Sequence, residues 1–206
     1  MITLAIDFST ERRSVCVMDP GGRLARASAH DRRVGAVGLI EGTLKEAGVG
    51  RGEIDRIALG LGPGSYTGIR SAIALAQGWS LVRKVDLVGV SSVDVMARSV
   101  DLEGDFEVLV DAQRGEFYRA RYRRSGAGIE QLLGLELVSR DGVSGDLPRF
   151  SPEPEKLGSG VSALFPDAEA LAKLAMEAKP APAEELAPIY LRPVEFHKAP
   201  PPRSLG

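Results

Sequence analysis

The stretch Leu4–Met18, LAIDFSTERRSVCVM, is an apolar segment that ends in Asp7, followed by a polar turn and a second β-rich segment. The stretch Val108–Tyr122, VLVDAQRGEFYRARY, repeats this order 104 residues later, with Asp111 in the place of Asp7. Each copy predicts two strands joined by a polar turn. Two such units, which halve a chain of 206 residues, predict a duplicated two-lobed α/β fold.

The other segments of the first half alternate between strand and helix patterns. The turn at 19–22 combines Asp, Pro and two glycines, which favours a reversal of the chain. The elements expected after it are a strand at 23–29, a helix at 34–47, a strand at 57–61, a helix at 69–82, a strand at 87–90 and a short helix with a capping box of Ser91 and Asp94.

The second half carries only one clear helical pattern, Asp167–Ala178, which Asp167 is expected to cap. We therefore expect an N-terminal lobe over residues 1–104 and a reduced C-terminal lobe over 105–198. The last residues, 199–206, read APPPRSLG and contain too few apolar side chains to pack, so they predict a disordered tail.

Composition narrows the class of protein. Lys and Arg number 26 against 28 Asp and Glu, and this net charge of −2 argues against a basic nucleic-acid-binding domain. One cysteine excludes an internal disulfide, and two histidines leave no zinc-finger spacing. The N-terminus lacks a basic signal-peptide region, and no apolar run approaches the roughly 18 residues of a membrane span. We therefore expect a cytoplasmic protein with no membrane partner and no metal site.

A glycine-rich loop follows the strand expected at 57–61. Its signature residues are Gly62, Pro63, Gly64, Ser65, Thr67 and Gly68. A strand, a glycine-rich loop and then a helix can present free N–H groups to an anion. The loop lacks the lysine of a P-loop and the G-x-G-x-x-G spacing, so a tight turn in which Ser65 or Thr67 caps the helix is the preferred interpretation.

Two strand-end carboxylates are candidates for a vestigial nucleotide site. Asp7 with Ser9, and Asp111 in the second copy, could hold hydrated Mg²⁺ while turn N–H groups meet phosphate. The alternative is that each aspartate bonds to the backbone of its own turn, which is favoured because neither turn carries a lysine or a glycine-rich cradle.

The remaining reactive side chains predict little chemistry. His30 and His197 are expected to be solvated, and Cys16 is expected to be a small buried residue within a strand. Arg119, Arg121 and Arg123 share one face of a strand. They could touch phosphates, although a solvated sheet face is the simpler interpretation.

The two helices expected in the first lobe suggest a partner. The helix at 69–82 is apolar on two sides, with Ile69, Ala72, Ile73, Ala76 and Trp79 on one of them. The helix at 34–47 has a stripe of Gly35, Gly38 and Gly42 opposite its expected core face of Val37, Ile40, Leu44 and Ala47. Each glycine within a helix costs about 1 kcal/mol relative to alanine, which close approach of another backbone could offset. A short or frayed first helix is the alternative.

Four segments resemble the TsaB family of bacterial tRNA threonylcarbamoyladenosine (t6A) biosynthesis. They are LAIDFST at 4–10, GLGPGSYTGIRSAIALAQGWSL at 60–81, VDAQRGEFYRARY at 110–122 and PIYLR at 188–192. The resemblance touches both halves of the chain. It implies an ASKHA fold, the architecture of actin, Hsp70 and sugar kinases, and a non-catalytic paralogue of TsaD, the subunit that transfers the threonylcarbamoyl group to the adenosine beside the anticodon.

The resemblance also implies a partner surface. TsaD binds metal through an H-x-x-x-H pair, but the matching stretch here, Arg32–Ala36, contains no histidine. In the family, TsaB and TsaD associate through their first two N-lobe helices. The residues expected at this interface are Val34, Gly35, Gly38, Glu41, Gly42, Lys45, Ile69, Ala72, Ile73, Ala76 and Trp79.

The resemblance thus implies a subunit that binds and activates TsaD, with TsaE joining and tRNA bound only through the complex. ATP or ADP with Mg²⁺ is expected only in that assembly, and this chain itself is expected to hold no cofactor. Two alternatives stay open. One is a small Mg·ATP phosphotransferase that uses Asp7 and Asp111, and the other is a homodimeric scaffold that pairs the same helices.

Overall fold

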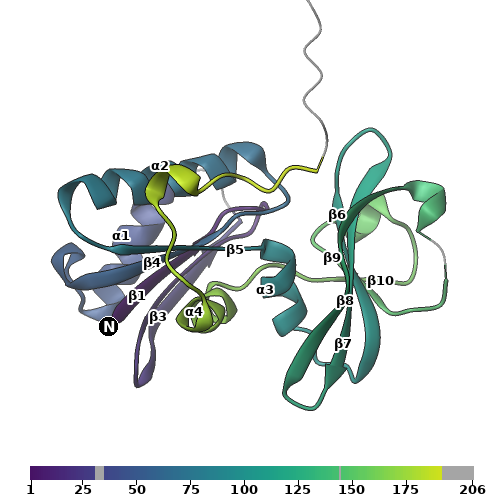
Figure 1. Ribbon diagram of the computed structural model, residues 1–206, viewed down its shortest axis with the longest axis horizontal. Helices are drawn as coiled ribbons and strands as arrows, with labels where there is room; N and C mark the ends of the chain where they lie inside the picture. Colours follow the sequence, from purple (N-terminus) through teal and green to yellow (C-terminus); the bar gives the residue numbers. More distant parts are fainter. Residues whose placement is uncertain (31–34, 144, 192–206) are drawn as a thin grey trace, which may run out of the picture.

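The structure is a computed structural model that describes residues 1–30, 35–143 and 145–191. Two five-stranded sheets lie beside each other (Figure 1). One helix, α3 (Ser92–Arg98), lies between them, and another, α4 (Ala168–Glu177), lies against the first sheet. Val34, His197 and the predicted tail at 199–206 lie outside the described residues. None of the helices in the described ranges is long and apolar enough to cross a membrane.

The first sheet has the strand order β3-β2-β1-β4-β5. Its strands are β1 (Ile2–Asp7), β2 (Arg13–Asp19), β3 (Gly22–Ala29), β4 (Ile54–Gly60) and β5 (Asp86–Val90). β1 pairs antiparallel with β2 and parallel with β4. The predicted turn at 19–22 is confirmed, because one carboxylate oxygen of Asp19 accepts the N–H groups of Gly21 and Gly22 at 2.8 and 3.1 Å.

The second sheet has the order β10-β9-β6-β7-β8. Its strands are β6 (Gly104–Asp111), β7 (Glu116–Ser125), β8 (Gly128–Ser139), β9 (Arg149–Ser151) and β10 (Val161–Ala163). Read from β8, the order and the strand directions repeat those of the first sheet, with an antiparallel β6–β7 pair and parallel β6–β9 and β9–β10 pairs. The predicted duplicated two-lobed α/β fold is therefore confirmed.

Over the residues that the structure describes, the second copy is reduced, because two helices of the first copy have no counterpart in it. In the first copy α1 (Ala36–Ala47) follows the third strand and α2 (Tyr66–Val82) follows the fourth, with a 3₁₀ turn η1 (Arg51–Glu53) between α1 and β4. In the second copy, the described residues of the corresponding connections form the 3₁₀ turns η2 (Arg140–Gly142) and η3 (Pro154–Lys156) and no α-helix.

α1 and α2 cover one face of the first sheet. α1 buries Leu39, Ile40, Thr43 and Leu44, and it ends at Gly48, whose φ of 67° lies in the left-handed region that glycine tolerates. The core of this lobe also contains strand residues such as Leu4, Ile6 and Leu59. Val37, predicted on the core side of α1, is 52% exposed, so that part of the prediction is wrong.

The last helix of each half lies across the join between the halves. α3 (Ser92–Arg98) packs Val93, Met96 and Ala97 against the second sheet. α4 (Ala168–Glu177) instead packs Leu171 and Ala172 against the first sheet. The expected division near residue 104 therefore does not describe α3 and α4, because each helix lies on the sheet of the opposite half.

The capping predictions had different outcomes. Asp167 caps α4 as predicted, since its carboxylate accepts the N–H of Glu169 at 2.7 Å. The prediction of a capping box at the start of α3 is wrong. Ser91 forms no side-chain cap, and the carboxylate of Asp94 instead accepts the hydroxyl of Tyr122 at 2.6 Å.

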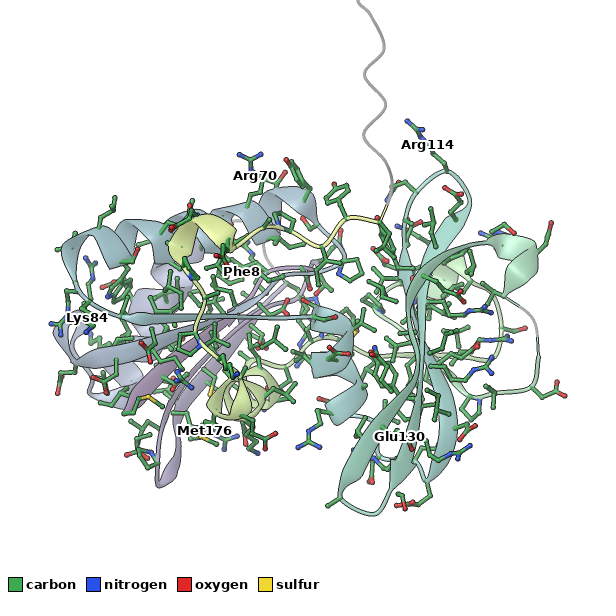
Figure 2. All side chains as sticks on the ribbon, viewed as in Figure 1. Phe8, Arg70, Lys84, Arg114, Glu130 and Met176 are labelled. Carbon is green, nitrogen blue, oxygen red and sulfur yellow. The ribbon has the colours of Figure 1, made fainter. Side chains whose placement is uncertain are left out.

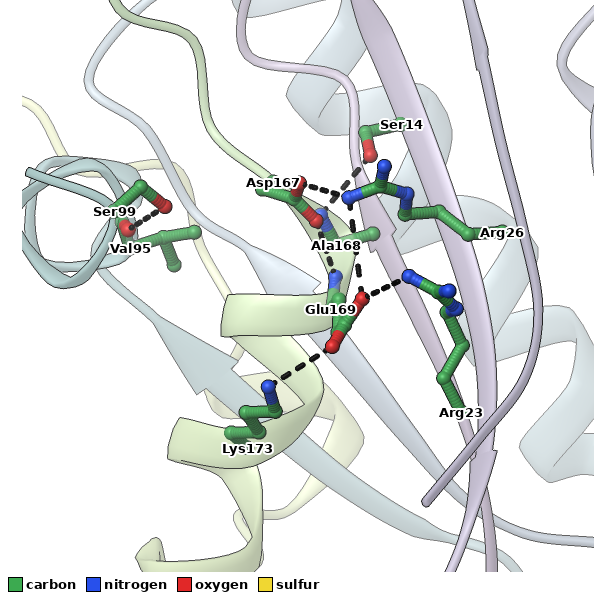
Figure 3. Close-up of polar contacts among 9 residues, drawn as sticks. All are labelled: Ser14, Arg23, Arg26, Val95, Ser99, Asp167, Ala168, Glu169 and Lys173. Carbon is green, nitrogen blue, oxygen red and sulfur yellow. Dashed lines mark hydrogen bonds and ion pairs between the residues drawn. The ribbon is translucent and has the colours of Figure 1, made fainter.

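Charged and polar contacts attach the start of α4 to the first sheet (Figure 3). Arg26 pairs with Asp167 at 2.6 Å, and Arg23 pairs with Glu169 at 2.6 Å. The hydroxyl of Ser14 accepts the N–H of Ala168 at 3.0 Å. α4 is thereby fixed to β2 and β3, strands that lie far from it in the sequence.

The chain after α4 runs back along the first lobe. The N–H of Ala181 bonds to the carbonyl of Leu87, and the N–H of Ile189 bonds to the carbonyl of Leu61, each at 2.8 Å. The 3₁₀ turn η4 (Ala183–Glu185) lies between these contacts and precedes Leu186, which joins the core. This segment brings Tyr190 beside the beginning of α2.

Candidate functional site

The inner side of α2 belongs to the protein's own core. Ile69, Ala72, Ile73 and Ala76 are between 0% and 6% exposed, and all four pack in the cluster that includes β1 and β4. The prediction that these side chains meet a partner is therefore wrong. Both sides of the helix are apolar, so the periodicity did not indicate which side the sheet covers.

The outer side of α1 carries the predicted glycine stripe. Gly35, Gly38 and Gly42 are exposed, and a Cβ atom built on any of them meets no heavy atom within 4 Å. Gly35 is the N-cap of α1, a position that glycine commonly occupies. Nothing within the described ranges accounts for glycine at the helical positions 38 and 42. Lys45 is exposed beside them, and a carboxylate oxygen of Glu41 accepts the Nε–H of Arg51 at 2.7 Å.

An apolar groove of about 410 Å³ lies between α1 and the end of α2. Its lining includes Val37, Leu75, Trp79 and Val82. Val82 is 85% exposed, and the neighbouring Leu81 is 88% exposed. Of these residues only Trp79 had been assigned to the partner surface. The apolar second side of the helix, noted in the sequence, is the signal for Leu75, Leu81 and Val82. We call the glycine stripe with this groove the α1–α2 face.

The glycine-rich loop is a tight connection that packs on the end of β1. A Cβ on Gly64 would collide with the carbonyl of Ser9, and a Cβ on Gly68 would collide with that of Phe8. The N–H of Ser65 donates to the carbonyl of Ser9 at 2.6 Å, and the hydroxyl of Ser65 accepts the N–H of Gly68 at 3.3 Å.

The remaining signature residues fit the same interpretation. The N–H of Gly62 donates to the hydroxyl of Ser92 at 3.0 Å, and the Gly62–Pro63 peptide bond is cis. Thr67 is exposed in the first turn of α2. The capped-turn interpretation is confirmed, because Ser65 is the N-cap of α2 and three amides of the loop are used within the protein.

Asp7 is enclosed beneath this loop. It is 1% exposed, and its carboxylate accepts the N–H and hydroxyl of Ser9 at 2.9 and 2.6 Å and the hydroxyl of Ser92 at 2.7 Å. Burial raises the pKa of Asp7, while the hydrogen bonds from Ser9 and Ser92 oppose that rise. Asp7 thus joins the end of β1 to α3, with its carboxylate packed against Gly60 at the end of β4, and this geometry does not direct it at a ligand.

Asp111 occupies the matching position but lies at a cleft. Its carboxylate accepts the N–H and side-chain amide of Gln113 at 2.8 and 2.9 Å and pairs with Lys156 at 2.6 Å. Glu153 lies beside it and accepts the N–H of Asp111 at 3.3 Å, and burial raises the pKa of Glu153. As with Asp7, the aspartate bonds to its own turn, which was the simpler of the two interpretations.

The cleft between the two lobes has a volume of about 790 Å³. One wall is the end of β1 and the start of α2, the other is the turn after β6, and Tyr190 lies at its edge. Residues that line it include Ser9, Thr10, Glu11, Arg13, Ser65, Tyr66, Thr67, Asp111, Gln113, Glu153 and Tyr190. Two of the three candidate nucleotide residues, Ser9 and Asp111, thus meet here, whereas Asp7 does not.

The strand arginines are neutralised by carboxylates. Arg121 pairs with Glu107 at 2.9 Å, Arg123 pairs with Asp105 at 2.6 Å, and Arg119 pairs with Glu136. The predicted solvated sheet face holds for Arg123, which is exposed, whereas Arg119 and Arg121 are partly buried in their ion pairs. These side chains do not form a free cationic row.

The other reactive residues lie as expected where the structure describes them. Cys16 is buried, and that burial raises the pKa of its thiol to about 12. His30 is exposed, with its ring edge against Phe165. Among residues 1–30, 35–143 and 145–191, no three His, Cys, Asp or Glu side chains gather as a metal site would require.

Comparison with known proteins identifies the family. The model of the family described as "TsaD: tRNA N6-adenosine threonylcarbamoyltransferase" matches residues 11–173. The tRNA threonylcarbamoyladenosine biosynthesis protein TsaB of Escherichia coli is 30% identical over 93% of this chain and 95% of its own length. The protein of the same name from Haemophilus influenzae is 32% identical over 56% of this chain and 51% of its own length.

The fold has a counterpart among solved structures. YeaZ from Pseudomonas aeruginosa superposes with a TM-score of 0.77 and 25% identity, covering 92% of this chain and 99% of that protein. This match extends through both sheets, and with it the predicted ASKHA-type fold is confirmed. The chain therefore belongs to the TsaB family, within the wider family that the TsaD model describes.

Proposed function

We propose that this chain, a member of a family of t6A biosynthesis proteins, is a non-catalytic subunit that binds TsaD through its α1–α2 face. The observation that carries the proposal is the exposure of that face. Gly38 and Gly42 stand in open space beside a groove lined by the exposed Val37 and Val82, and the exposed Leu81 adjoins Val82 in the chain. Exposed apolar surface of this kind is typical of protein–protein contacts.

Small residues on one helix and apolar side chains on its neighbour suit a helical partner. A glycine stripe lets a second helix approach closely, while the groove can receive larger apolar side chains. The proposed contact residues are now Gly35, Gly38, Glu41, Gly42, Lys45, Leu75, Trp79, Leu81 and Val82. Val34 lies outside the described residues and stays a prediction from the sequence.

The non-catalytic role is supported by the two aspartates. Both have their oxygens in hydrogen bonds or an ion pair with the protein's own side chains and turns. The phosphotransferase alternative gains no support from this geometry. We propose further that TsaE and tRNA join only the assembled complex, and that ATP or ADP with Mg²⁺ acts there.

Association is tested by size-exclusion chromatography with light scattering, using this chain, TsaD of the same organism and their mixture. We expect a new one-to-one peak from the mixture, and faster t6A formation when this chain is added to TsaD. Two unchanged peaks, with and without Mg·ATP, would contradict the proposal. A dimer of this chain that TsaD cannot displace would favour the homodimeric scaffold instead.

The interface is tested by Gly38→Leu with Gly134→Leu as its matched control. Both glycines are exposed, and a Cβ on either meets no heavy atom within 4 Å. We expect Gly38→Leu to weaken TsaD binding at least tenfold while the melting temperature stays at or above that of the parent, since leucine favours a helix. Gly134→Leu should bind TsaD like the parent. Equal binding by both variants would show that the α1–α2 face is not the interface.

A further inference from the structure

The apolar groove of the α1–α2 face has two hydrogen-bond donors on the wall formed by α2. Trp79 and Arg83 lie four residues apart, and both line the groove. Within the residues that the structure describes, neither the indole N–H of Trp79 nor the guanidinium of Arg83 has an acceptor. Both donors are therefore available to an acceptor that another molecule brings.

The guanidinium of Arg83 lies beside the 3₁₀ turn η1. A Cβ atom built on Gly52 would come within 2.9 Å of its Nη1 atom, so glycine at this position leaves room for the guanidinium. Arg51, the neighbour of Gly52, also lines the groove, but its guanidinium is paired with the carboxylate of Glu41 at 2.7 Å. In the described part of the groove lining, the guanidinium of Arg83 thus has no anion of its own.

The groove is also more positive than the chain as a whole. Its charged lining residues are one carboxylate, Glu41, and two guanidiniums, Arg51 and Arg83, whereas the whole chain carries a net charge of −2. Lys84 follows Arg83, is exposed and forms no ion pair within the described ranges. Figure 2 shows Lys84 on the first lobe, where α2 has ended. This sign of charge favours a partner that presents carboxylates.

The remaining lining of the groove is apolar and open. Its side chains include Val37, Ile40, Leu75 and Val82. Gly78 also lines it, and a Cβ atom built on this glycine meets no heavy atom within 4 Å. The volume of about 410 Å³ lies in the range of pockets that enclose a small ligand, so a whole leucine, methionine or phenylalanine side chain fits.

We infer that TsaD places one large apolar side chain in this groove, and that a carboxylate beside that side chain accepts hydrogen bonds from Trp79 and Arg83. The inference rests on the proposed function and adds the chemistry of the partner, an apolar residue next to Asp or Glu on the surface of TsaD. Tryptophan and arginine are the residues that most often dominate the energy of an interface. A hydrogen bond from a guanidinium to a carboxylate is also about twice as strong as one between neutral groups.

The two donors are tested by titration calorimetry of TsaD with the full chain. Arg83→Gln should weaken binding about tenfold, and Trp79→Phe, which keeps an aromatic ring but has no N–H, about fivefold. Because both donors act on one carboxylate, the double variant should lose less affinity than the product of the two single losses. A double loss equal to that product would show that the donors share no acceptor and would overturn the inference.

Salt dependence separates Arg83 from other exposed cations. Association of the parent with TsaD should slow as salt rises, and Arg83→Gln should reduce this dependence, because it removes a charge at the interface. The matched control is Arg114→Gln, on the turn between β6 and β7 (Figure 2). Arg114 is exposed and forms no ion pair with a described residue. The control should bind like the parent, and equal behaviour of the two variants would contradict the inference.

The apolar anchor is tested by filling the groove from within. Gly78→Leu places a side chain in the open space and should weaken TsaD binding about tenfold, while the melting temperature stays at or above that of the parent, since leucine favours a helix. Gly134→Leu, whose Cβ also meets no heavy atom within 4 Å, is again the matched control and should bind like the parent.

Trp79 itself reports whether the groove is filled. It is the single tryptophan of the chain, so a parent labelled with fluorotryptophan gives one fluorine NMR signal, and that signal comes from the groove. The signal should shift when unlabelled TsaD is added. An unchanged signal in a complex that has formed would show that TsaD leaves the groove empty, which overturns the inference.

Failure of the inference and failure of the proposed function give different results. If TsaD binds the parent, and Trp79→Phe, Arg83→Gln and Gly78→Leu bind it equally well, the inference is overturned and the proposed function stands. If TsaD binds no form of this chain, the proposed function fails and the inference fails with it. A dimer of this chain whose fluorine signal TsaD does not alter would show that a second copy fills the groove instead.

Discussion

The two sheets share one strand order. Each has one face that packs against α3 or α4, and they differ in the side chains on the opposite face. In the first sheet this face is apolar, with residues such as Leu4, Ile6 and Leu59 beneath α1 and α2. In the second sheet the same face carries Glu107, Arg119 and Arg121, and the described chain places no α-helix over it. One architecture is thus completed by helices in one copy and by charges in the other.

Glu107 is the centre of the charged face. It is 1% exposed, and Arg121 and Arg149 donate to its two oxygens at 2.9 and 3.3 Å, with Arg119 3.9 Å away. The ion pairs neutralise this face, which also holds the buried Leu109 and Phe117. In the described chain, the second sheet has no counterpart of the α1–α2 face.

The largest effect should come from placing a charge beneath α2. Ala76 is 0% exposed against the first sheet, so Ala76→Glu buries an unpaired carboxylate. We expect a loss of about 4 kcal/mol or more in the free energy of unfolding, measured by urea denaturation.

The matched control is Ala74→Glu, on the exposed side of the same helix. Its stability should stay within about 0.5 kcal/mol of the parent, since exposed substitutions cost little. If Ala76→Glu were as stable as Ala74→Glu, the inner side of α2 would not be core and the original interface prediction would be restored.

The charged face of the second sheet gives the next largest effect. Glu107→Gln leaves three arginines around a neutral acceptor, and we expect a loss of about 2 to 3 kcal/mol, at the low end for a broken buried pair because the arginines are partly exposed. The control Glu130→Gln, exposed on β8, should be near neutral by the same urea titration. Equal stability of the two variants would mean that the charges do not stabilise this face.

A smaller effect is expected where α3 meets the second sheet. Tyr122→Phe removes the 2.6 Å hydrogen bond to Asp94 and should cost about 1.5 kcal/mol. The control is Tyr118→Phe on the same strand and face. Its stability should hardly change, because no bond of the Tyr118 hydroxyl is found within the described ranges. A similar cost for both variants would place the stabilisation in the rings rather than in the contact with α3.

The smallest effect concerns pH and Asp7. Burial raises the pKa of Asp7 above its ordinary value of 3.8, so the folded chain holds a proton that the unfolded chain has already released. Stability must then fall as pH rises from near 3.8 through the raised value. Compared with Asp7→Asn, the parent should lose urea resistance between pH 4 and pH 7. A difference that stays constant over this range would show that the pKa is not raised.

The local pattern predicted most of the first copy, because strong periodicity and turn residues coincide there. Asp19–Gly22 and Gly48 end their elements for reasons visible in single residues. β8 was missed, because its pairing with β7 shifts register near Arg121 and no regular alternation of apolar residues remains. The three-residue strands β9 and β10 are too short to have a period of their own.

The candidate site was harder to predict than the fold. Ile73 and Leu81 are both apolar residues of one helix, and only the position of the sheet makes one of them core and the other surface. The pairing of Tyr66 with Tyr190 joins residues far apart in the chain, and no periodicity connects them. The aspartates were easier, because each bonds to a residue two positions ahead.

The exchange of α3 and α4 between the sheets also affects how the chain could be divided. A cut before Gly104 would leave α3 on the N-terminal fragment, although it packs against the sheet of the C-terminal one. It would leave α4 on the C-terminal fragment, although it packs against the sheet of the N-terminal one. Each fragment would then present an apolar helix face that only the other fragment can bury. In this respect the chain resembles a domain-swapped dimer whose two subunits have been fused. A split version is expected to fold only when both fragments are present.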